Sequence, residues 1–203
     1  MSVESGQTSS VGAAPPDRGM VVVRHGATEW SETGQHTSRT DLPLLPVGRE
    51  RAKRLAGVLD PSQFARVLCS PLLRARETCE LAGFGDHAEI VEDLREWDYG
   101  EYEGLTTPQI RERDPNWSLW RDGCPGGEAP ETVAARADRV IARAGDGATI
   151  AFAHGHILRV CAARWIELSA AGGARLVLSP AALGVLGYER ETRVLQRWNV
   201  DRL

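Results

Sequence analysis

The sequence has almost no lysine, few cysteines and no long apolar run. Lys53 is the only lysine among 24 basic residues, so arginine carries nearly all of the positive charge. Arginine is the better bidentate binder of phosphate, although a GC-rich coding sequence would produce the same bias without a functional cause. Each arginine is therefore judged by its position in the chain.

The cysteines indicate a reducing environment. Four of them lie far apart and form no C-x-x-C pair: Cys69, Cys79, Cys124 and Cys161. This spacing argues against a zinc site or a disulfide framework, and it favours reduced thiols and a cytoplasmic location.

Charge and hydropathy also exclude several classes of partner. No apolar run approaches the roughly 20 residues that cross a bilayer, and the first residues lack the basic start and apolar stretch of a signal peptide. Asp and Glu number 28, the net charge is −4 and the isoelectric point lies near 5.8. We therefore expect neither a nucleic-acid partner nor a membrane partner.

The composition changes near position 20. Residues Met1 to Gly19 are rich in Ser, Gly, Ala and Pro, which predicts a disordered tail. The rest of the 203-residue chain is 20–203, and 42% of the whole sequence is hydrophobic. That length and composition predict one domain with a substantial core.

Strand and helix patterns alternate along this domain. Short β-branched or wholly apolar runs predict strands at 20–23, 66–69, 89–91, 148–153, 183–188 and 194–198. Spacings of three and four between apolar residues predict helices at 46–59, after Ser70-Pro71, at 133–144 and at 156–168. The pattern predicts an α/β fold, a three-layer α/β/α sandwich around a mainly parallel sheet.

Two predicted strands end in similar polar groups. Arg24-His25-Gly26 follows the first strand, and His154 follows the strand at 148–153. Parallel strands end at the same edge of a sheet, where ligands bind. Arg74 lies in the first turn of a predicted helix, where free amides favour an anion. Two guanidiniums and two imidazoles would together suit a phosphate dianion.

Each of these signals is weak alone. An R-H-G tripeptide often occurs by chance. A histidine at a strand end is more often structural than catalytic, and Arg74 alone could be a surface residue on a capped helix. The functional interpretation therefore depends on all four residues occurring together at element ends.

The complete set of motifs resembles the histidine phosphatase superfamily, also called the phosphoglycerate mutase-like family. The resemblance runs from Met20 to about Trp198 and is carried by R-H-G-A-T-E-W at 24–30, S-P-L-L-R-A-R-E-T at 70–78, L-R-E-W-D-Y-G-E-Y-E-G at 94–104 and A-H-G-H at 153–156. Segments 34–44 and 120–128 are similar to the branch that holds a fungal sedoheptulose bisphosphatase and an actinobacterial acid phosphatase. Ser31 also matches that branch, where many other relatives have asparagine.

The resemblance implies a metal-independent phosphoryl transfer through histidine. His25 would attack phosphorus with one ring nitrogen while the other carries a proton held by a backbone acceptor. Arg24, Arg74 and His154 would hold the non-bridging oxygens. Neither a metal nor another cofactor is implied, because the arginines supply the positive charge.

The acid is not chosen by spacing alone. Four carboxylates are close together in the sequence: Glu96, Asp98, Glu101 and Glu103. The family pattern selects Glu96 as the acid that protonates the leaving oxygen and then activates water. Glu103 is interpreted as structural.

Substrate contacts are implied less directly. The branch implies that Thr37, Tyr99 and Arg121 contact substrate. Arg159 is expected on a helix face or behind the contact residues. His36 and four tryptophans are expected near the pocket: Trp30, Trp97, Trp117 and Trp120.

Three functions fit these residues. The first is a phosphomonoesterase acting on a small phosphorylated metabolite such as a sugar phosphate. The second is a phosphoglycerate mutase, and the third is a catalytically silent binding domain of the same fold. The chain from Glu96 to His154 spans 58 positions, which leaves little to cover the site and favours hydrolysis. The sequence leaves open whether two copies form a homodimer.

Overall fold

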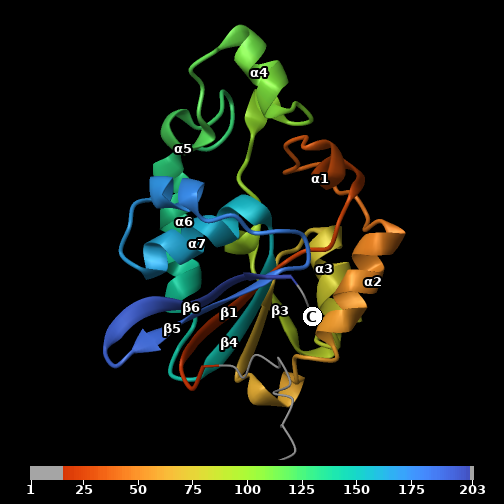
Figure 1. The fold of residues 1–203 in the computed structure, drawn as a ribbon, viewed down its shortest axis with the longest axis vertical. Helices are drawn as coiled ribbons and strands as arrows, with labels where there is room; N and C mark the ends of the chain where they lie inside the picture. The colour runs from red at the N-terminus through yellow and green to blue at the C-terminus, as the bar shows by residue number, and fades with distance from the viewer. Residues whose placement is uncertain (1–15, 202–203) are drawn as a thin grey trace, which may run out of the picture.

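A six-stranded sheet forms the centre of the molecule. The computed structural model describes residues 16–201, and its strands lie in the order β3-β2-β4-β1-β5-β6. Their bounds are β1 Gly19–Arg24, β2 Arg66–Cys69, β3 Ala88–Ile90, β4 Ala148–Ala153, β5 Leu183–Glu189 and β6 Thr192–Val200. The pairs among β1 to β4 are parallel, whereas β5 and β6 add an antiparallel hairpin beside β1. The predicted α/β fold with a mainly parallel sheet is confirmed (Figure 1).

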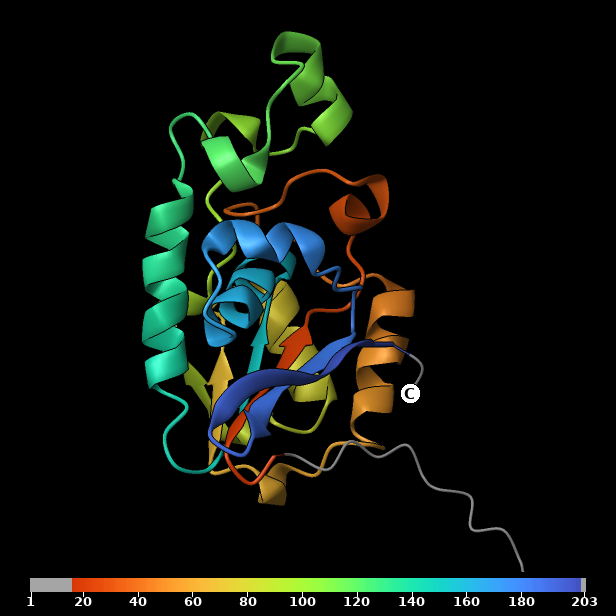
Figure 2. The ribbon, with the colours of Figure 1, turned by 60° about the vertical axis from the view of Figure 1, so that its left-hand side comes forward.

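Helices cover both faces of this sheet. The longer ones are α2 Pro46–Leu55, α3 Leu73–Leu81, α6 Pro130–Ala142 and α7 Gly155–Trp165. Helices α2 and α3 lie on one face and α6 and α7 on the other (Figures 1 and 2). Strand β1 is buried from both sides, because Met20 and Val22 join the core under α6 and α7 while Val21 and Val23 join the opposite core. Successive strand residues point to opposite faces, so an unbroken apolar run suits this central position.

Short helices complete the fold. They are α1 Glu29–Thr33, α4 Thr107–Arg113 and α5 Leu119–Asp122, with 3₁₀ turns at 61–63, 85–87, 92–94, 100–102 and 170–175. Helices α1 and α4 were not predicted, although each begins with a capping box, in which Thr28 pairs with Ser31 and Thr106 with Gln109. None of the helices in residues 16–201 is long and apolar enough to cross a membrane.

Several predicted boundaries shift. The helix expected after Ser70-Pro71 begins only at Leu73, and the Ser70 hydroxyl contacts His154 instead of capping it. Helix α2 ends at Leu55 rather than residue 59, with Gly57 just beyond it. Of the tail predicted at 1–19, residues 1–15 lie outside the described chain, and Gly19 is a buried residue of β1.

One segment of the chain extends away from the sheet and returns to the point where it began. Residues 98–101 and 125–128 lie against each other: Glu101 N donates to Pro125 O at 2.9 Å, and Glu128 N donates to Asp98 O at 2.9 Å. A Cβ on Gly100 would lie 2.2 Å from Pro125 O, so this approach requires glycine. We call residues 98–101 and 125–128 the neck, and residues 102–124 the cap. The cap carries α4 and α5, away from the sheet (Figure 1).

Candidate active site

His25 lies at the end of β1 with one ring nitrogen fixed. Its Nδ1 lies 2.7 Å from Gly26 O, so Nδ1 carries the proton and Nε2 keeps a free lone pair. Burial, together with the charges of Arg74 and Arg24, holds the pKa of His25 well below 6.5. The ring is therefore a neutral imidazole, the form in which it can attack an electrophile.

His154 lies next to His25 because β1 and β4 end together. Arg24 pairs with Ala153 in the parallel register, and the two imidazole centroids are 5.2 Å apart. His154 Nδ1 accepts from Arg74 Nε at 3.1 Å, and Nε2 lies 2.7 Å from Ser70 Oγ. An imidazole nitrogen that accepts from a guanidinium is unprotonated, so Nε2 is the donor to Ser70.

Arg74 is fully buried under a loop formed by Thr37–Thr40. Its two terminal nitrogens donate to the carbonyl oxygens of Thr37, Ser38 and Thr40 at 3.1–3.3 Å. Glu103 holds the same loop from the other side, since its carboxylate accepts from Ser38 N and Thr40 N. Four of the five N–H groups of Arg74 are thereby engaged, and its charge stays fixed beside both histidines.

Arg24 has a buried N–H donor without a hydrogen-bond partner in the described part of the chain. One terminal nitrogen donates to Leu178 O at 2.6 Å, but the buried Nε has no partner within residues 16–201. Buried N–H groups are nearly always hydrogen-bonded. The unpaired Nε would lie 3.3 Å from a Cβ on Gly155, which lines the same cavity as His25, and it suits an oxygen of a bound anion.

Glu96 is anchored at the N-terminus of α7. Its Oε1 accepts from Trp97 N and Ile157 N, and its Oε2 accepts from His156 N, each at 2.9 Å. The side chain is buried and lines the same cavity as Arg24 and His25. Three backbone amides thus fix the position of this carboxylate in the cavity lining.

The other three carboxylates of this region have different surroundings. Asp98 pairs with Arg39, Glu103 holds the Thr37–Thr40 loop, and Glu101 is exposed. Of the four carboxylates, Glu96 is the one that lines the cavity with His25, and its role as the acid stays a prediction.

A cavity of about 260 Å³ opens beside these groups. It is lined by Arg24, His25, Thr28, Trp30, Ser31, Gly34, Gln35, His36, Thr37, Glu96, Tyr99, Thr107, Gly155, His156, Arg159 and Leu178. Thr37 and Tyr99, which were predicted to contact substrate, both line this cavity. Arg74 and His154 have no exposed surface and lie behind this lining.

Arg121 does not reach the cavity. Its guanidinium lies on the surface of α5, where it donates to both carboxylate oxygens of Asp122 and to Asn116 O. The predicted substrate contact at Arg121 therefore lacks support from the structure, because the neighbouring carboxylate fixes the side chain away from the site. Arg159, which was expected to lie farther back, lines the cavity instead.

An aromatic and imidazole cluster forms the far end of the cavity. His36 stacks on Tyr99 with centroids 4.7 Å apart, and the Tyr99 hydroxyl lies 2.6 Å from His156 Nδ1. Burial raises the pKa of Tyr99 well above 10, so the phenol stays protonated. His36 Nε2 is buried and unpaired within residues 16–201. Sequence reasoning missed His156, although the second histidine of A-H-G-H was a visible signal.

Apart from the Glu96 carboxylate, the charged groups of this site are guanidiniums, and they lie around the nucleophile. Among residues 16–201, no three side chains of His, Cys, Asp or Glu gather in a way that could hold a metal ion. The cavity therefore offers a neutral imidazole nucleophile, nearby guanidiniums and one anchored carboxylate. This set can transfer an electrophilic, anionic group to nitrogen and then to water.

Comparison with known proteins gives consistent relatives. The family model described as "Histidine phosphatase superfamily (branch 1)" matches residues 20–201. An acid phosphatase of Mycobacterium tuberculosis is 41% identical over 187 residues, which cover 87% of this chain and 89% of that protein. A sedoheptulose 1,7-bisphosphatase of Saccharomyces cerevisiae is 38% identical over 182 residues, covering 73% of this chain and 67% of that protein.

Solved structures agree with these relatives. The structure of the open reading frame Rv3214 from Mycobacterium tuberculosis superimposes with a TM-score of 0.86 at 37% identity, covering 91% of this chain and 98% of that one. A mycobacterial glucosyl-3-phosphoglycerate phosphatase complexed with VO₃ gives a TM-score of 0.79 at 29% identity, with 90% and 99% coverage.

Proposed function

Because the chain belongs to the histidine phosphatase superfamily and is a phosphoric monoester hydrolase, we propose that it hydrolyses small phosphorylated metabolites through a phosphohistidine on His25. Sugar phosphates are the proposed substrate class. The observation that carries the proposal is the 2.7 Å distance between His25 Nδ1 and Gly26 O, which assigns the proton to Nδ1 and leaves Nε2 free beside Arg24 and Arg74.

The first step transfers the phosphoryl group to His25. The Nε2 lone pair forms a bond to phosphorus while the bond from phosphorus to the leaving oxygen breaks. Gly26 O stabilises the positive charge that develops on the ring, through the Nδ1 proton. Glu96 in its acid form gives its proton to the leaving oxygen.

Positive groups hold the phosphoryl oxygens during this transfer. Arg24 supplies the unpaired Nε, and Arg74 supplies a charge that the Thr37–Thr40 loop keeps in place. His154 keeps its proton on Nε2, because Nδ1 accepts from Arg74, and Nε2 donates to the phosphoryl group when a bound anion replaces Ser70 Oγ as the acceptor. Loss of one such donor typically lowers the rate by about 100-fold or more.

The second step returns the enzyme to its starting state. Glu96, now ionised, accepts a proton from water as the water oxygen bonds to phosphorus. The bond between phosphorus and nitrogen breaks, inorganic phosphate leaves, and His25 regains its lone pair. Both proton transfers use the carboxylate that α7 anchors.

The far end of the cavity supports a polar organic group as the alcohol part of the substrate. Arg159 donates through Nε to Gly173 O and lies over the Trp120 ring at 4.5 Å. Tyr99, His36 and His156 present aromatic surface together with polar atoms. Such a mixture suits a hydroxylated or carboxylated metabolite.

Hydrolysis fits the structure better than a mutase reaction. A mutase must keep its phosphohistidine away from water until the second acceptor is in place. Helix α6 takes 13 residues of the chain between Glu96 and His154, and the cap is one short excursion. We therefore expect phosphate release from phosphoglycerates to exceed their interconversion, as measured with labelled substrate.

The nucleophile is tested with His25→Ala, using His87→Ala on the exposed turn at 85–87 as the matched control. With a panel of labelled phosphorylated metabolites, His25→Ala should lose turnover, and the unchanged enzyme should give an acid-labile, base-stable phosphoenzyme after rapid quench. His87→Ala should behave as the unchanged enzyme. Full activity of His25→Ala would refute the proposal.

Metal independence is a separate expectation. Arginine supplies the positive charge that a magnesium ion supplies in other phosphoryl-transfer sites. Dialysis against a strong chelator should leave the rate unchanged, and vanadate should inhibit because it mimics pentacoordinate phosphorus. A rate that returns only when magnesium is added would contradict the charge argument.

A further inference from the structure

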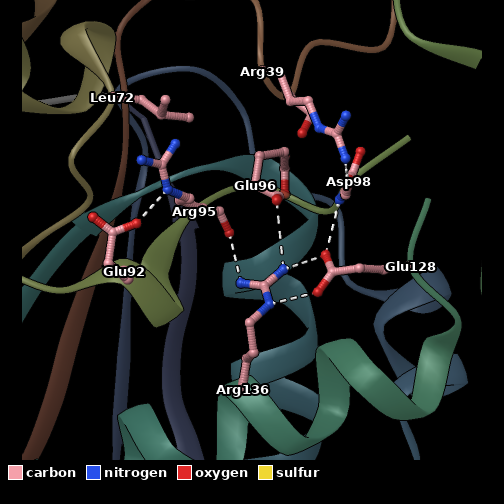
Figure 3. A pocket seen from close by; sticks show the side chains of 9 residues that line it. Arg39, Leu72, Glu92, Arg95, Glu96, Asp98, Glu128 and Arg136 are labelled. Carbon is pink, nitrogen blue, oxygen red and sulfur yellow. Dashed lines mark hydrogen bonds and ion pairs between the residues drawn. The ribbon is translucent and has the colours of Figure 1, made fainter. Parts of the chain in front are cut away.

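Arg136 lies beneath the segment that carries Glu96, beside a second cavity of about 440 Å³ (Figure 3). It belongs to α6, and its side chain is only 11% exposed. It forms a two-point ion pair with Glu128, Nε to Oε1 at 2.8 Å and Nη2 to Oε2 at 2.6 Å. A buried arginine of this kind is fixed in direction as well as in charge.

The same guanidinium also binds the main chain around Glu96. Nη1 donates to Asp93 O at 2.8 Å and to Arg95 O at 2.9 Å, and Nη2 donates to Glu96 O at 3.4 Å. The 3₁₀ turn at 92–94 and the two residues that follow it are therefore attached to α6 through one side chain.

Glu128 continues the attachment on the other side of Glu96. Its Oε2 accepts from Asp98 N at 2.9 Å, and its carbonyl accepts from Trp97 Nε1 at 2.9 Å. The Arg136–Glu128 pair thus contacts the chain before, at and after Glu96. Figure 3 shows both side chains converging on this segment from α6 and from the neck.

We propose that Arg136 is a positioning residue for Glu96; the proposal rests on the acid and base role proposed above. The Glu96 carboxylate is held by amides of α7, whereas its main chain is held by a side chain of α6. Two helices therefore fix opposite ends of one residue. Proton transfer needs the carboxylate within hydrogen-bond reach of the leaving oxygen, and an error of about 1 Å can reduce a rate by about 100-fold.

Arg139 provides a matched control on the same helix. It lies one turn after Arg136 and forms a two-point ion pair with the Asp93 side chain, but it is 57% exposed and makes no hydrogen bond to Glu96. Arg136→Lys and Arg139→Lys both keep the charge and remove the planar fork. Only Arg136→Lys removes the guanidinium that donates to the main chain of Glu96.

The readout is the pre-steady-state burst for two leaving groups. A sugar alkoxide needs an acid, whereas nitrophenolate is a stable anion and hardly needs one. Arg136→Lys should slow the burst from a sugar phosphate by about 10- to 100-fold, change the nitrophenyl phosphate burst far less, and leave KM nearly unchanged. Arg139→Lys should keep both bursts within about twofold of the unchanged enzyme.

A double-mutant cycle with Glu96→Gln separates positioning from a general loss of structure. If Arg136 acts through Glu96, adding Arg136→Lys to Glu96→Gln should slow the sugar phosphate burst little further. Equal losses for both leaving groups, or full additivity in the cycle, would overturn the proposal while leaving the role of Glu96 intact. Equal losses in Glu96→Gln itself would instead remove the acid role.

Should Arg136→Lys unfold, as judged by near-ultraviolet circular dichroism, Glu128→Gln gives the second test. It removes the ionic partner of Arg136 and keeps an oxygen that can accept from Asp98 N. The expected result is the same selective loss for the sugar phosphate, with nonadditivity toward Glu96→Gln. An unselective loss in this variant would overturn the proposal.

Discussion

The individual side chains of the site are held mainly by backbone atoms. Gly26 O fixes the His25 proton, three amides fix Glu96, and three loop carbonyls fix Arg74. Backbone atoms move less than side chains on binding, so the charges that meet the phosphoryl group are already in place. Such preorganisation is the main source of electrostatic stabilisation in enzymes.

Arg159 is expected to contribute to substrate affinity. Its guanidinium lines the cavity and is oriented by Gly173 O and the Trp120 ring. A hydrogen bond to a charged group contributes about 1.5–3 kcal/mol, so Arg159→Ala should raise KM for a sugar phosphate by roughly 10- to 100-fold with a smaller effect on kcat.

Arg121→Ala is the matched control, because Arg121 pairs with Asp122 on the surface. Its KM should stay within about twofold of the unchanged enzyme. A larger KM effect for Arg121→Ala than for Arg159→Ala would restore the prediction made from the sequence.

At the scale of elements, the site is built where the ends of β1, β4 and α3 meet α7. The in-phase end of β1 and β4 places His25 beside His154, and α7 begins directly after β4. Helix α2 packs on the turn after β1 with almost no space. A Cβ on Gly26 would lie 2.6 Å from Gly48 O, and one on Gly48 would lie 2.4 Å from Ala27 O.

Gly26→Ala should therefore destabilise the protein. The added methyl meets backbone atoms of α2, which cannot rotate away, and overpacking of this kind costs about 1–3 kcal/mol or more. Urea unfolding followed by circular dichroism should show a lower midpoint. Gly57→Ala, whose Cβ would meet its nearest atom at 3.4 Å, should change the midpoint much less.

The sequence predicted those parts of the site that depend on regular structure. His25 and His154 follow mostly apolar strands, and parallel strands end at one edge, so their proximity could be inferred. Ser70 could not be assigned correctly, because a serine before proline is typical of a helix cap, and its bond to His154 depends on tertiary packing. The sequence placed Arg121 at the cavity and Arg159 behind it for a similar reason. Neither position could be predicted, because the Asp122 carboxylate and the Trp120 ring decide where each guanidinium lies.

At the scale of the whole molecule, four of the five histidines gather at one cavity: His25 and His154 are buried, and His36 and His156 are half-buried. Burial lowers the pKa of His36 to about 4. Burial also lowers the pKa of His25, His154 and His156 well below 6.5. All four are thus neutral in the folded protein at pH values where the unfolded chain binds protons.

This difference predicts loss of stability in acid. At pH 7.5 and above neither state protonates these rings appreciably, so their effect is nearly absent. As pH falls below 6.5 the unfolded state gains protons that the folded state does not bind, and each such ring lowers the free energy of unfolding by about 1.4 kcal/mol per pH unit until its folded pKa is reached.

Urea unfolding at pH 8.5, 7.5 and 5.5 measures this slope. The free energy of unfolding should be nearly constant between the two higher values and should fall at pH 5.5. His87→Gln, which removes an exposed histidine, should not change the slope. A stability that rises toward pH 5.5 would contradict the assignment of four imidazoles that stay neutral in the folded protein.

The neck allows the residues that carry out the reaction and the residues that select the substrate to change independently in evolution. Both ends of residues 102–124 start from one tightly packed point, where Gly100 and Gly127 allow the two backbone segments to come into contact. Closing a longer or shorter loop at such a point changes the loop entropy by only about 0.6 kcal/mol per doubling of length. Glu103 in this stretch holds the Thr37–Thr40 loop over Arg74, so an exchange that keeps Glu103 would leave β1, β4, α7 and their reaction unchanged. Grafting the remainder of a relative's equivalent stretch onto this neck replaces Thr107 and Trp120 and tests how far they select the metabolite.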